Sequence, residues 1–493
     1  MLPELEVEME TGTGKTFVYI KTIFELNKRY GWSKFIVIVP GVAIREGVKK
    51  SFDVMADKFQ DDYGKLAKTY VYNSAHPQDV KDFSTSAGIQ VLVMNVQAFN
   101  AEGKGSAVAR RIYMALDDFA SRRPIDMIAA NRPILILDEP QKMEGRATSE
   151  MLPKFNPLVI LRYSATHKTI RNLVYRLDAI DAFDRKLVKK IEPVCIDVSN
   201  RAGVCQYVYC AEIRPGKTGT EAVLEFQVKR RDGEIVNETH IVRERDDLYV
   251  LSKKVEAYQD RYVVSELNAK DGYGTLAFEN GLILSPGQVV GDVSEPQLRR
   301  IQIREAIRAH LEKERRLFAQ GIKVLTLFFI DKVANYRTYA DESDTTGTSG
   351  EYAQMFEAEY AKAVGDELGG MLVDSALRKY WENISAKDAH AGYFSEDKKH
   401  KLVNSKEKDS EQNKDAYDLI LKNKERLLSL EEPVRFIFSH SALREGWDNP
   451  NVFVICPLKK PDSGNDVARR QEVGRGLRLC VNQDGERIDD PAT

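Results

Sequence analysis

The sequence has few cysteines, no long apolar run and almost no net charge, and each shortage excludes a class of protein. Its five cysteines among 493 residues form no CxxC pair, so we expect neither a zinc site nor a disulfide framework. No apolar stretch approaches the roughly 20 residues that a membrane helix needs. The start, MLPELEVEME, lacks the basic and apolar segments of a signal peptide. We therefore expect a cytoplasmic protein with no membrane partner.

The charge balance excludes a protein that wraps nucleic acid by global attraction. Lysine and arginine number 73 against 75 aspartates and glutamates, a formal net charge of −2. Any contact with nucleic acid must then come from local grooves. The length predicts about three or four domains. Only eight residues precede the first motif discussed below, and the last residues, GERIDDPAT, have no evident terminal element. We expect a piece of a longer protein.

Residues 1–195 contain short apolar runs that alternate with helical stretches. Continuous runs of this kind are typical of parallel strands that are buried on both faces. A doubly wound α/β lobe is predicted from the runs LEVEM, FIVIVP (35–40), VLVMNV (91–96), ILILDEP (134–140) and LVILRYSAT (158–166).

Residues 196–292 change to alternating patterns, such as VLEFQV (223–228) and TLAFENGLIL (275–284). Asp232-Gly233 and Asn280-Gly281 stand at hairpin positions. This stretch predicts an antiparallel β insertion, which could act as a brace or as a surface for DNA or a partner.

Residues 293–493 predict a second α/β lobe. Ser294 and Gln297 form a capping box at the start of a helix, which leads into the strand KVLTLFFI (323–330). The runs VRFIFSHSA (434–442) and VFVICPL (452–458) supply further strands, and residues 338–430 read as a helical, charged insertion.

The strongest motif is METGTGKT (9–16), between the first predicted strand and a helical segment. In a phosphate-binding loop the glycines let backbone N–H groups approach the phosphates at a helix N-terminus. Lys15 would reach the β- and γ-phosphates, and Thr16 would bind Mg²⁺. Met9 replaces the first glycine of the usual pattern.

Two further motifs follow buried strands. Asp138 and Glu139 end the run ILILDEP, at the strand end where open α/β sheets bind ligands. Asp138 there could hold Mg²⁺, and Glu139 could orient or deprotonate the attacking water. Ser164 and Thr166 lie in the segment YSAT. Taken alone, the first pair would be read as a solvated turn and the second as a helix cap.

The C-terminal region carries RRQEVGRGLRL (469–479), in which Gln471, Arg475 and Arg478 form a QxxGRxxR pattern. At a helix start, arginines three residues apart share one face and could reach phosphoryl oxygens. A basic, solvated helix is the alternative. Gly446 and Asp448, just upstream, could approach the triphosphate and ribose or form a plain loop.

In this order, the motifs resemble those of superfamily 2, DEAD/DEAH-like helicases. The closer resemblance is to the restriction (Res) subunit of type III restriction-modification enzymes, and it spans about residues 9–480. The segments that carry it are METGTGKT, VPGVAIREGV (39–48), VLVMNVQAFN (91–100), LDEPQKMEG (137–145), RYSATHK (162–168), LFFIDKVANYR (327–337), FSHSALREGWDNPNVF (438–453) and RRQEVGRGLRL.

The resemblance implies an α/β fold of two RecA-like P-loop lobes, each a parallel sheet with helices on both faces, separated by the antiparallel β insertion. It implies ATP and Mg²⁺ as cofactors, bound by Gly12, Thr13, Gly14, Lys15, Thr16 and Asp138. It also implies Glu139 as catalytic carboxylate, coupling by Ser164 and Thr166, and γ-phosphate sensing by Gln471, Arg475 and Arg478. Sequence-independent DNA contacts are implied at Pro40, Gly41, Val42, Asn95, Gln97, Asp331 and Lys332.

The family comparison also indicates what this chain lacks. An adenine-reading segment would precede Met1, and a nuclease domain would lie beyond Thr493. We therefore expect an ATP-dependent DNA translocase or helicase motor of a type III endonuclease, acting on double-stranded DNA with a methyltransferase (Mod) subunit. The alternatives are a superfamily 2 helicase outside restriction, working in repair or on RNA, and a nucleotide- or DNA-binding fragment with little turnover.

Overall fold

The computed structural model contains two compact units. One comprises residues 1–190 and 304–493, and the other comprises residues 191–303. The fold is described for residues 2–73, 78–100, 111–116, 119, 121–143, 145–167, 169–193, 197–199, 207–216, 219–269, 274–291, 293–341, 343–344, 346–369, 374–396, 401–403, 426–440, 449–459 and 466–490. Within these ranges no helix has the length and apolar character of a membrane span.

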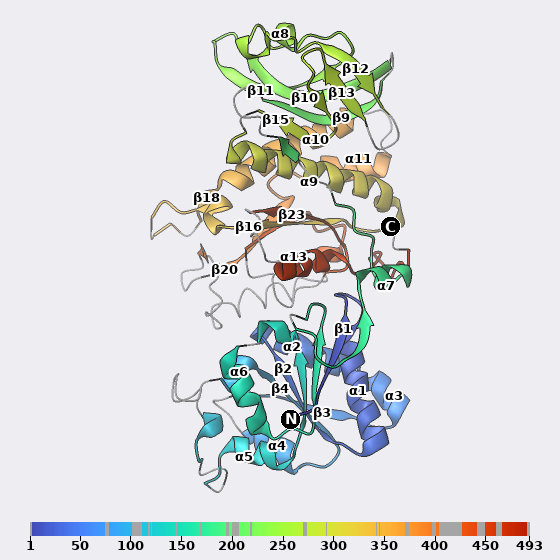
Figure 1. The fold of residues 1–493 in the computed structure, drawn as a ribbon, viewed down its shortest axis with the longest axis vertical. Helices are drawn as coiled ribbons and strands as arrows, with labels where there is room; N and C mark the ends of the chain where they lie inside the picture. The colour runs from blue at the N-terminus through green and yellow to red at the C-terminus, as the bar shows by residue number, and fades with distance from the viewer. Residues whose placement is uncertain are drawn as a thin grey trace. The chain divides into compact units, whose positions relative to one another are not determined.

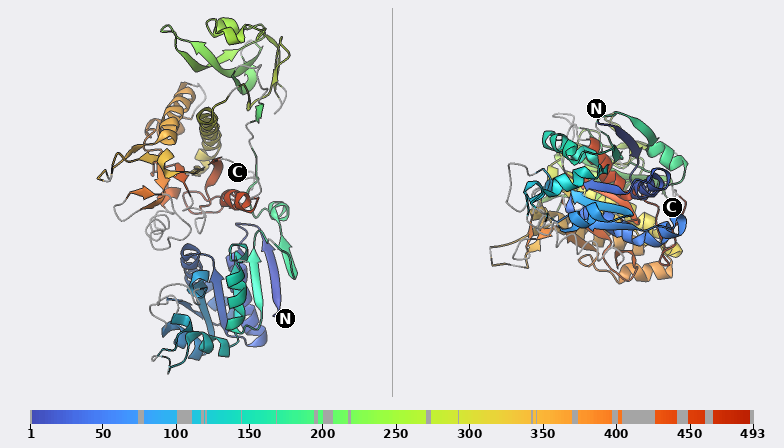
Figure 2. Two further views of the ribbon diagram at one scale, coloured as in Figure 1. Left: turned by 60° about the vertical axis from the view of Figure 1, so that its left-hand side comes forward. Right: turned by 90° about the horizontal axis from the view of Figure 1, so that it is seen from below.

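The first half of the larger unit is built on a seven-stranded sheet in which every pairing is parallel. Its strand order is β3-β4-β2-β5-β6-β1-β7. The strands are β1 (Glu4–Met9), β2 (Lys34–Val39), β3 (Ala67–Val71), β4 (Ile89–Asn95), β5 (Ile134–Asp138), β6 (Ile160–Ser164) and β7 (Leu173–Leu177). Figures 1 and 2 show these blue and teal strands side by side between helices.

Alternate residues of the central strands enter two separate cores, which is why these runs are apolar throughout. On β2, Phe35 and Val37 pack with the first group of helices, whereas Ile36 and Ile38 pack with the second. The first group is α1 (Lys15–Tyr30), α2 (Val42–Val54) and α3 (Ala56–Tyr63), and the second includes α4 (Gln78–Thr85) and α5 (Pro124–Ala130). The remaining helices of this half are α6 (Arg146–Met151) and α7 (Ala179–Asp184).

The second half of the larger unit has a four-stranded parallel sheet in the order β19-β22-β16-β23. Its strands are β16 (Leu325–Ile330), β19 (His390–Tyr393), β22 (Phe436–Ser439) and β23 (Val452–Leu458). Its helices are α10 (Glu351–Gly369), α11 (Ser375–Glu382), α13 (Asp466–Val473) and the part of α9 (Glu295–Leu317) from residue 304 on. Two short ladders pair β17 (Arg337–Thr338) with β18 (Thr348–Ser349) and β20 (Ser395–Glu396) with β21 (Leu402–Val403).

The smaller unit carries two mostly antiparallel sheets, in the orders β11-β10-β9-β15-β8 and β12-β13-β14. The pairing of β15 with β8 is parallel. The elements are β8 (Asp197–Ser199), β9 (Val208–Gly216), β10 (Gly219–Lys229), β11 (Ile235–Val242), α8 (Leu248–Leu251), β12 (Val264–Asn268), β13 (Thr275–Phe278), β14 (Ile283–Leu284) and β15 (Gln288–Val290).

The predicted fold class is confirmed by these sheets, and local signals also hold. Ser294 and Gln297 exchange the bonds of a capping box at the start of α9, with Ser294 N to Gln297 Oε1 at 2.9 Å and Gln297 N to Ser294 Oγ at 3.4 Å. The turn at Asp232-Gly233 joins β10 to β11. One expectation needs correction, because β19 lies inside the stretch 338–430 that was read as an insertion. The segment HAGY has no apolar run, and its pairing with β22 alone identifies it as a strand.

Candidate functional site

The loop between β1 and α1 has the geometry of an anion-binding turn. Gly12 and Gly14 have φ angles of 87° and 91°, a left-handed conformation that side chains with a Cβ rarely adopt. Thr13 Oγ1 donates to the carbonyl oxygen of Glu10 at 2.7 Å, which fixes the turn. Gly14 is the N-cap of α1 and brings no side chain to its first N–H groups. These N–H groups are therefore available to an anion.

Lys15 and the two carboxylates after β5 form a charged cluster beside this loop. Lys15 Nζ lies 3.6 Å from Asp138 Oδ1 and forms an ion pair with Glu139. Burial lowers the pKa of Lys15, although Asp138 counteracts the shift. Asp138 is 4% exposed, and its Oδ1 atom has the Lys15 ammonium as its counter-charge but accepts no hydrogen bond. A buried carboxylate oxygen that accepts no hydrogen bond can still accept a ligand.

Glu139 has a strained backbone. Its φ of 57° and ψ of 53° lie in the left-handed region, and such a conformation costs a residue other than glycine about 1–3 kcal/mol. Its N–H donates to the carbonyl oxygen of Tyr163 at 3.0 Å, which ties the turn after β5 to β6. Strain maintained by surrounding contacts is common at functional sites, and here it sets the direction of the Glu139 side chain.

Gln141 connects the carboxylate pair to the segment after β6. Its Nε2 atom donates to Glu139 Oε2, and it lies 3.4 Å from Thr166 Oγ1. Its Oε1 atom accepts from Ser164 Oγ at 2.8 Å. Ser164 Oγ in turn accepts from the backbone N–H of Thr166 at 2.9 Å. The sequence pattern did not single out Gln141. Its position two residues after Glu139, and an amide that can both donate and accept hydrogen bonds, could have indicated that it connects the carboxylate to a second polar group.

Tyr19 is a second residue that the sequence did not single out. It is fully buried in α1, and its hydroxyl donates to Asp138 Oδ2 at 3.5 Å. Burial, reinforced by Asp138, raises the pKa of Tyr19 well above its usual value. A tyrosine on the core face of a helix is normally read as packing, so no pattern distinguished it.

The segment after α13 lies against the loop at 10–16. A Cβ atom at Gly474 would come within 2.9 Å of Thr11 Oγ1, and one at Gly12 would lie 3.1 Å from Arg478 Cγ. Arg478 also forms an isolated β-bridge with Val188. The larger unit thus brings the loop at 10–16 and the QxxGRxxR segment together.

The predicted helix start at Arg475 is wrong. Helix α13 ends at Val473, Arg475 lies in a 3₁₀ turn, Gly474–Gly476, and Arg478 follows that turn. Two glycines within three residues disfavour a helix, and Gly474 is also the point of close approach. Gln471 lies in the last turn of α13, so the three residues are joined by a turn and not by one helical face.

The predicted DNA-contacting residues lie at the carboxyl ends of both parallel sheets. Pro40 and Gly41 follow β2, Val42 begins α2, and Asn95 ends β4. Gln97 Nε2 donates to the carbonyl oxygen of Pro40 at 3.1 Å, so these two segments meet. Asp331 and Lys332 follow β16 and are exposed, and Asp331 accepts from Asn335 at 2.9 Å. Gly446 and Asp448 lie outside the described residues.

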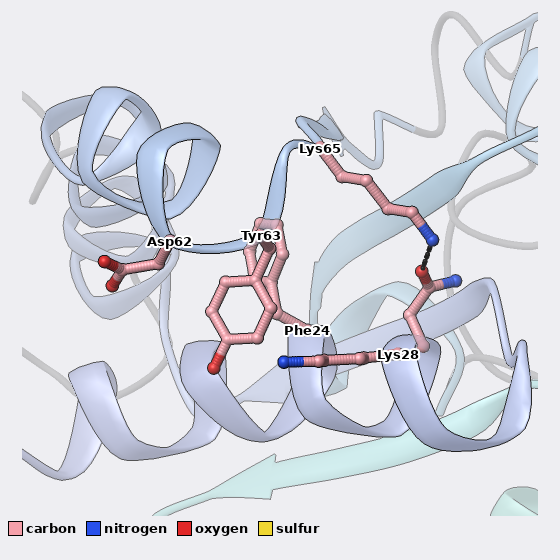
Figure 3. Close-up of a pocket in the computed structure, with 6 residues that line it drawn as sticks. Phe24, Lys28, Asp62, Tyr63 and Lys65 are labelled. Atoms are coloured by element: carbon pink, nitrogen blue, oxygen red, sulfur yellow. Dashed lines mark hydrogen bonds between the residues drawn. The ribbon is translucent and has the colours of Figure 1, made fainter.

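A small pocket of about 120 Å³ lies at the far end of α1, lined by Phe24, Asn27, Lys28, Asp62, Tyr63 and Lys65. Lys65 Nζ donates to Asn27 Oδ1 at 2.8 Å, and Figure 3 draws a hydrogen bond from Lys65 as a dashed line. Lys28 lies 13 positions after Lys15, a rise of about 20 Å along a helix. Helices α1 and α3 both end near this pocket, and their negative ends disfavour an anion. We therefore place the candidate site at the other end of α1.

Comparisons with known proteins identify relatives over nearly the whole chain. The family model "Type III restriction enzyme, res subunit" matches residues 4–169. The EcoP15I Res subunit of Escherichia coli is 36% identical over 99% of this chain and 48% of its own length, and the EcoPI Res subunit of Escherichia phage P1 gives the same three values. The chain thus spans about half the length of these relatives.

Among solved structures, the helicase MrfA bound to DNA and AMPPNP aligns with 97% of this chain and 44% of its own. The two chains are 10% identical, with a TM-score of 0.42. Over the half of their length that it spans, this chain is similar to the Res subunits of type III restriction enzymes.

Proposed function

We propose that this chain is the ATP-driven DNA motor of a type III restriction-modification enzyme. One observation carries the proposal: the loop at 10–16 contacts two other segments. Lys15 pairs with Asp138 and Glu139, and the loop also lies close to the segment 474–478. Nucleotide hydrolysis needs phosphate-binding amides, a carboxylate near the attacking water and cations near the phosphates. These three segments supply all of them.

In this proposal each residue has a separate task. Backbone amides at Gly12–Thr16 and the Lys15 ammonium bind the phosphates, and in doing so Lys15 exchanges its ion pair with Glu139 for phosphate oxygens. The freed Glu139 carboxylate then orients the attacking water and accepts its proton. Arg475, Arg478 and Gln471 reach the γ-phosphate from the second lobe, where arginines stabilise the charge that develops in the transition state.

The residues fit a divalent cation. Asp138 Oδ1 is buried and accepts no hydrogen bond, and Thr16 is the second residue of the helix that Lys15 begins. Mg²⁺ prefers such hard oxygen ligands and is commonly held by one or two protein groups together with phosphate oxygens. When bound, it would neutralise charge on the phosphate oxygens. We assign Thr16 and Asp138 to this role.

Gln141 would connect hydrolysis with movement. Its amide contacts Glu139 on one side and Ser164 and Thr166 on the other, so a change at the carboxylate alters the bonds available to the hydroxyl pair. The DNA-contacting residues proposed for the first lobe, Pro40, Gly41, Val42, Asn95 and Gln97, follow strands of the same sheet. Asp331 and Lys332 serve the second lobe. Contacts of this kind would engage the backbone and not the bases.

The domain organisation follows from this proposal. We assign residues 1–195 and 293–493 to two RecA-like lobes and residues 196–292 to a β-rich insertion. Since the relatives are Res subunits, we further propose that the parent enzyme acts on double-stranded DNA with a Mod subunit that supplies sequence recognition. Gly446 and Asp448 are proposed to approach the nucleotide.

The proposal is tested by measuring ATP hydrolysis with and without duplex DNA. Turnover should rise when DNA is added, and Lys15→Ala should abolish it. Lys28→Ala is the matched control, because it removes the same charge from the last turn of the same helix. Nucleotide binding without DNA-stimulated hydrolysis would contradict the motor function. Turnover that survives in Lys15→Ala would contradict the site.

A further inference from the structure

One hydroxyl group contacts Asp138, one of the two residues to which we assigned the divalent cation. It belongs to Tyr19, which is one helical turn after Thr16, the other residue, so that the two side chains share one face of α1. The same hydroxyl donates to Asp138 Oδ2 at 3.5 Å. This distance is long for an O–H···O bond, but catalytic hydrogen bonds in ligand-free sites are often long and tighten on binding.

The tyrosine ring is fixed by its surroundings. Tyr19 is 0% exposed and lies in the core between α1 and the sheet. Its ring meets that of Tyr163 edge-on, with centroids 5.6 Å apart and planes at 64°. Tyr163 is held in turn by its hydroxyl, which donates to Thr22 Oγ1 at 3.2 Å. Since the ring cannot move freely, the Tyr19 hydroxyl occupies a set position.

Packing alone does not account for this hydroxyl. Phenylalanine would fill the same core volume, and a buried hydroxyl costs free energy unless it is hydrogen-bonded. The hydrogen-bond partner of this hydroxyl is Asp138. Because the hydroxyl contacts Oδ2, the Asp138 oxygen that accepts no hydrogen bond is Oδ1, which lies 3.6 Å from Lys15 Nζ.

We propose that Tyr19 is a positioning residue of the nucleotide site: from the same face of α1 as Thr16, it holds Asp138 so that the Oδ1 atom is ready to bind the divalent cation of the metal–nucleotide complex. The proposal rests on the proposed function. Groups that orient metal ligands typically contribute 10–100-fold to metal affinity. Because the Tyr19 contact with Asp138 is long, we expect the lower end, about tenfold.

The test compares Tyr19→Phe with Tyr163→Phe in the full chain. Both variants lose one buried hydroxyl from the same ring pair, but the Tyr163 hydroxyl contacts Thr22 and not the proposed metal ligands. Binding of Mn²⁺ is measured by electron paramagnetic resonance in the presence of ADP, and ADP affinity is measured separately in EDTA. Neither measurement depends on turnover.

Tyr19→Phe should raise the Mn²⁺ dissociation constant about tenfold and leave the affinity for ADP in EDTA unchanged. Tyr163→Phe should change neither. An unchanged Mn²⁺ affinity in Tyr19→Phe, or an equal loss in both variants, would overturn the proposal and leave the proposed function intact. Failure of the unaltered chain to bind ADP at all would overturn the proposed function itself. If Tyr19→Phe weakens ADP binding in EDTA as much as Mn²⁺ binding, the residue is structural.

Discussion

The larger unit contains two clusters of buried charge that differ in how completely their charges are paired. In the lobe of α9, the carboxylate of Glu314 accepts from Arg435 Nη1 at 2.6 and 2.9 Å, and Trp381 Nε1 donates to it at 2.8 Å. Both of its oxygens thus have donors. At the proposed nucleotide site, Asp138 Oδ1 accepts no hydrogen bond.

The difference separates a structural cluster from a binding site. Burial raises the pKa of Glu314, but Arg435 and His310 outweigh it and hold the pKa at about 2. We call this cluster closed because both oxygens of its carboxylate accept hydrogen bonds, although Arg435 Nε and His310 Nε2 have no hydrogen-bond partner. In the candidate site, Asp138 Oδ1 faces the Lys15 ammonium at 3.6 Å without accepting a hydrogen bond, and Glu139 has a strained conformation. Buried charge alone is therefore a weak sign of function, and an open carboxylate oxygen beside a strained residue is a stronger one.

The largest expected effect is on catalysis, at the incompletely paired cluster. Glu139→Gln keeps the shape of the side chain but removes its basicity, so ATP turnover should fall about 10³-fold. Nucleotide affinity, measured by equilibrium binding, should remain. Glu150→Gln, which alters an exposed ion pair with Arg146, should change neither quantity. Full turnover in Glu139→Gln would mean that another group activates the water.

The next effect is on stability, at the closed cluster. Arg435→Met leaves the carboxylate of Glu314 buried without its main cation and should lower the free energy of unfolding by about 3–5 kcal/mol. Urea titration followed by circular dichroism measures the loss. Arg315→Met is the control, since Arg315 pairs with Glu367 at 49% side-chain exposure and such pairs contribute about 0–1 kcal/mol. Equal losses in the two variants would remove the distinction between the clusters.

A smaller effect is expected where the nucleotide site connects to the hydroxyl pair. Gln141→Ala removes the contacts among Glu139, Ser164 and Thr166, and DNA-stimulated ATP turnover should fall about tenfold, which corresponds to about 1.4 kcal/mol. Ser164→Ala should add little to Gln141→Ala, because residues of one network are not additive. Steady-state hydrolysis at saturating DNA measures both effects. Fully additive losses would show that Gln141 acts independently of Ser164.

The smallest effect is a pH dependence beside the closed cluster. Burial lowers the pKa of Lys323 from 10.5 to about 7. The unfolded chain therefore binds a proton more tightly than the folded chain between these values, and stability should rise with pH through this window. From pH 7 to 8 the gain is about 1 kcal/mol. Thermal unfolding should show a rising midpoint, and Lys323→Met should reduce the rise. A midpoint that falls over this interval would contradict the shifted pKa.

The sequence predicted the strands whose two faces are buried and the loop whose glycines set its backbone conformation. The apolar runs of β2, β4 and β5 are recognisable because both of their faces are buried. The loop at 9–16 is recognisable because few other sequences let amides converge on a phosphate. The strand β19 was missed because its segment, HAGY, is defined by pairing and not by hydrophobicity.

The candidate site was predicted less completely, because some of its groups are defined only by tertiary contacts. Gln141 and Tyr19 were missed since an amide after a strand and a tyrosine in a helix are common, and only the fold brings them to Glu139 and Asp138. The helix predicted at Arg475 failed for a related reason. The spacing of the two arginines suits one face of a helix, whereas the approach of Thr11 to Gly474 requires a turn without a side chain.

The absence of a side chain at position 474 also sets how near the two halves of the nucleotide site can come. Gly474 has an ordinary backbone conformation, so alanine is tolerated by the chain itself, and the single added methyl group would meet Thr11 Oγ1 at 2.9 Å. Such a methyl group acts as a spacer. It would hold Arg475 and Arg478 away from the loop by a fraction of an ångström without altering any charge. The distance between the arginines and the loop could thus be changed while every charged group of the site is kept.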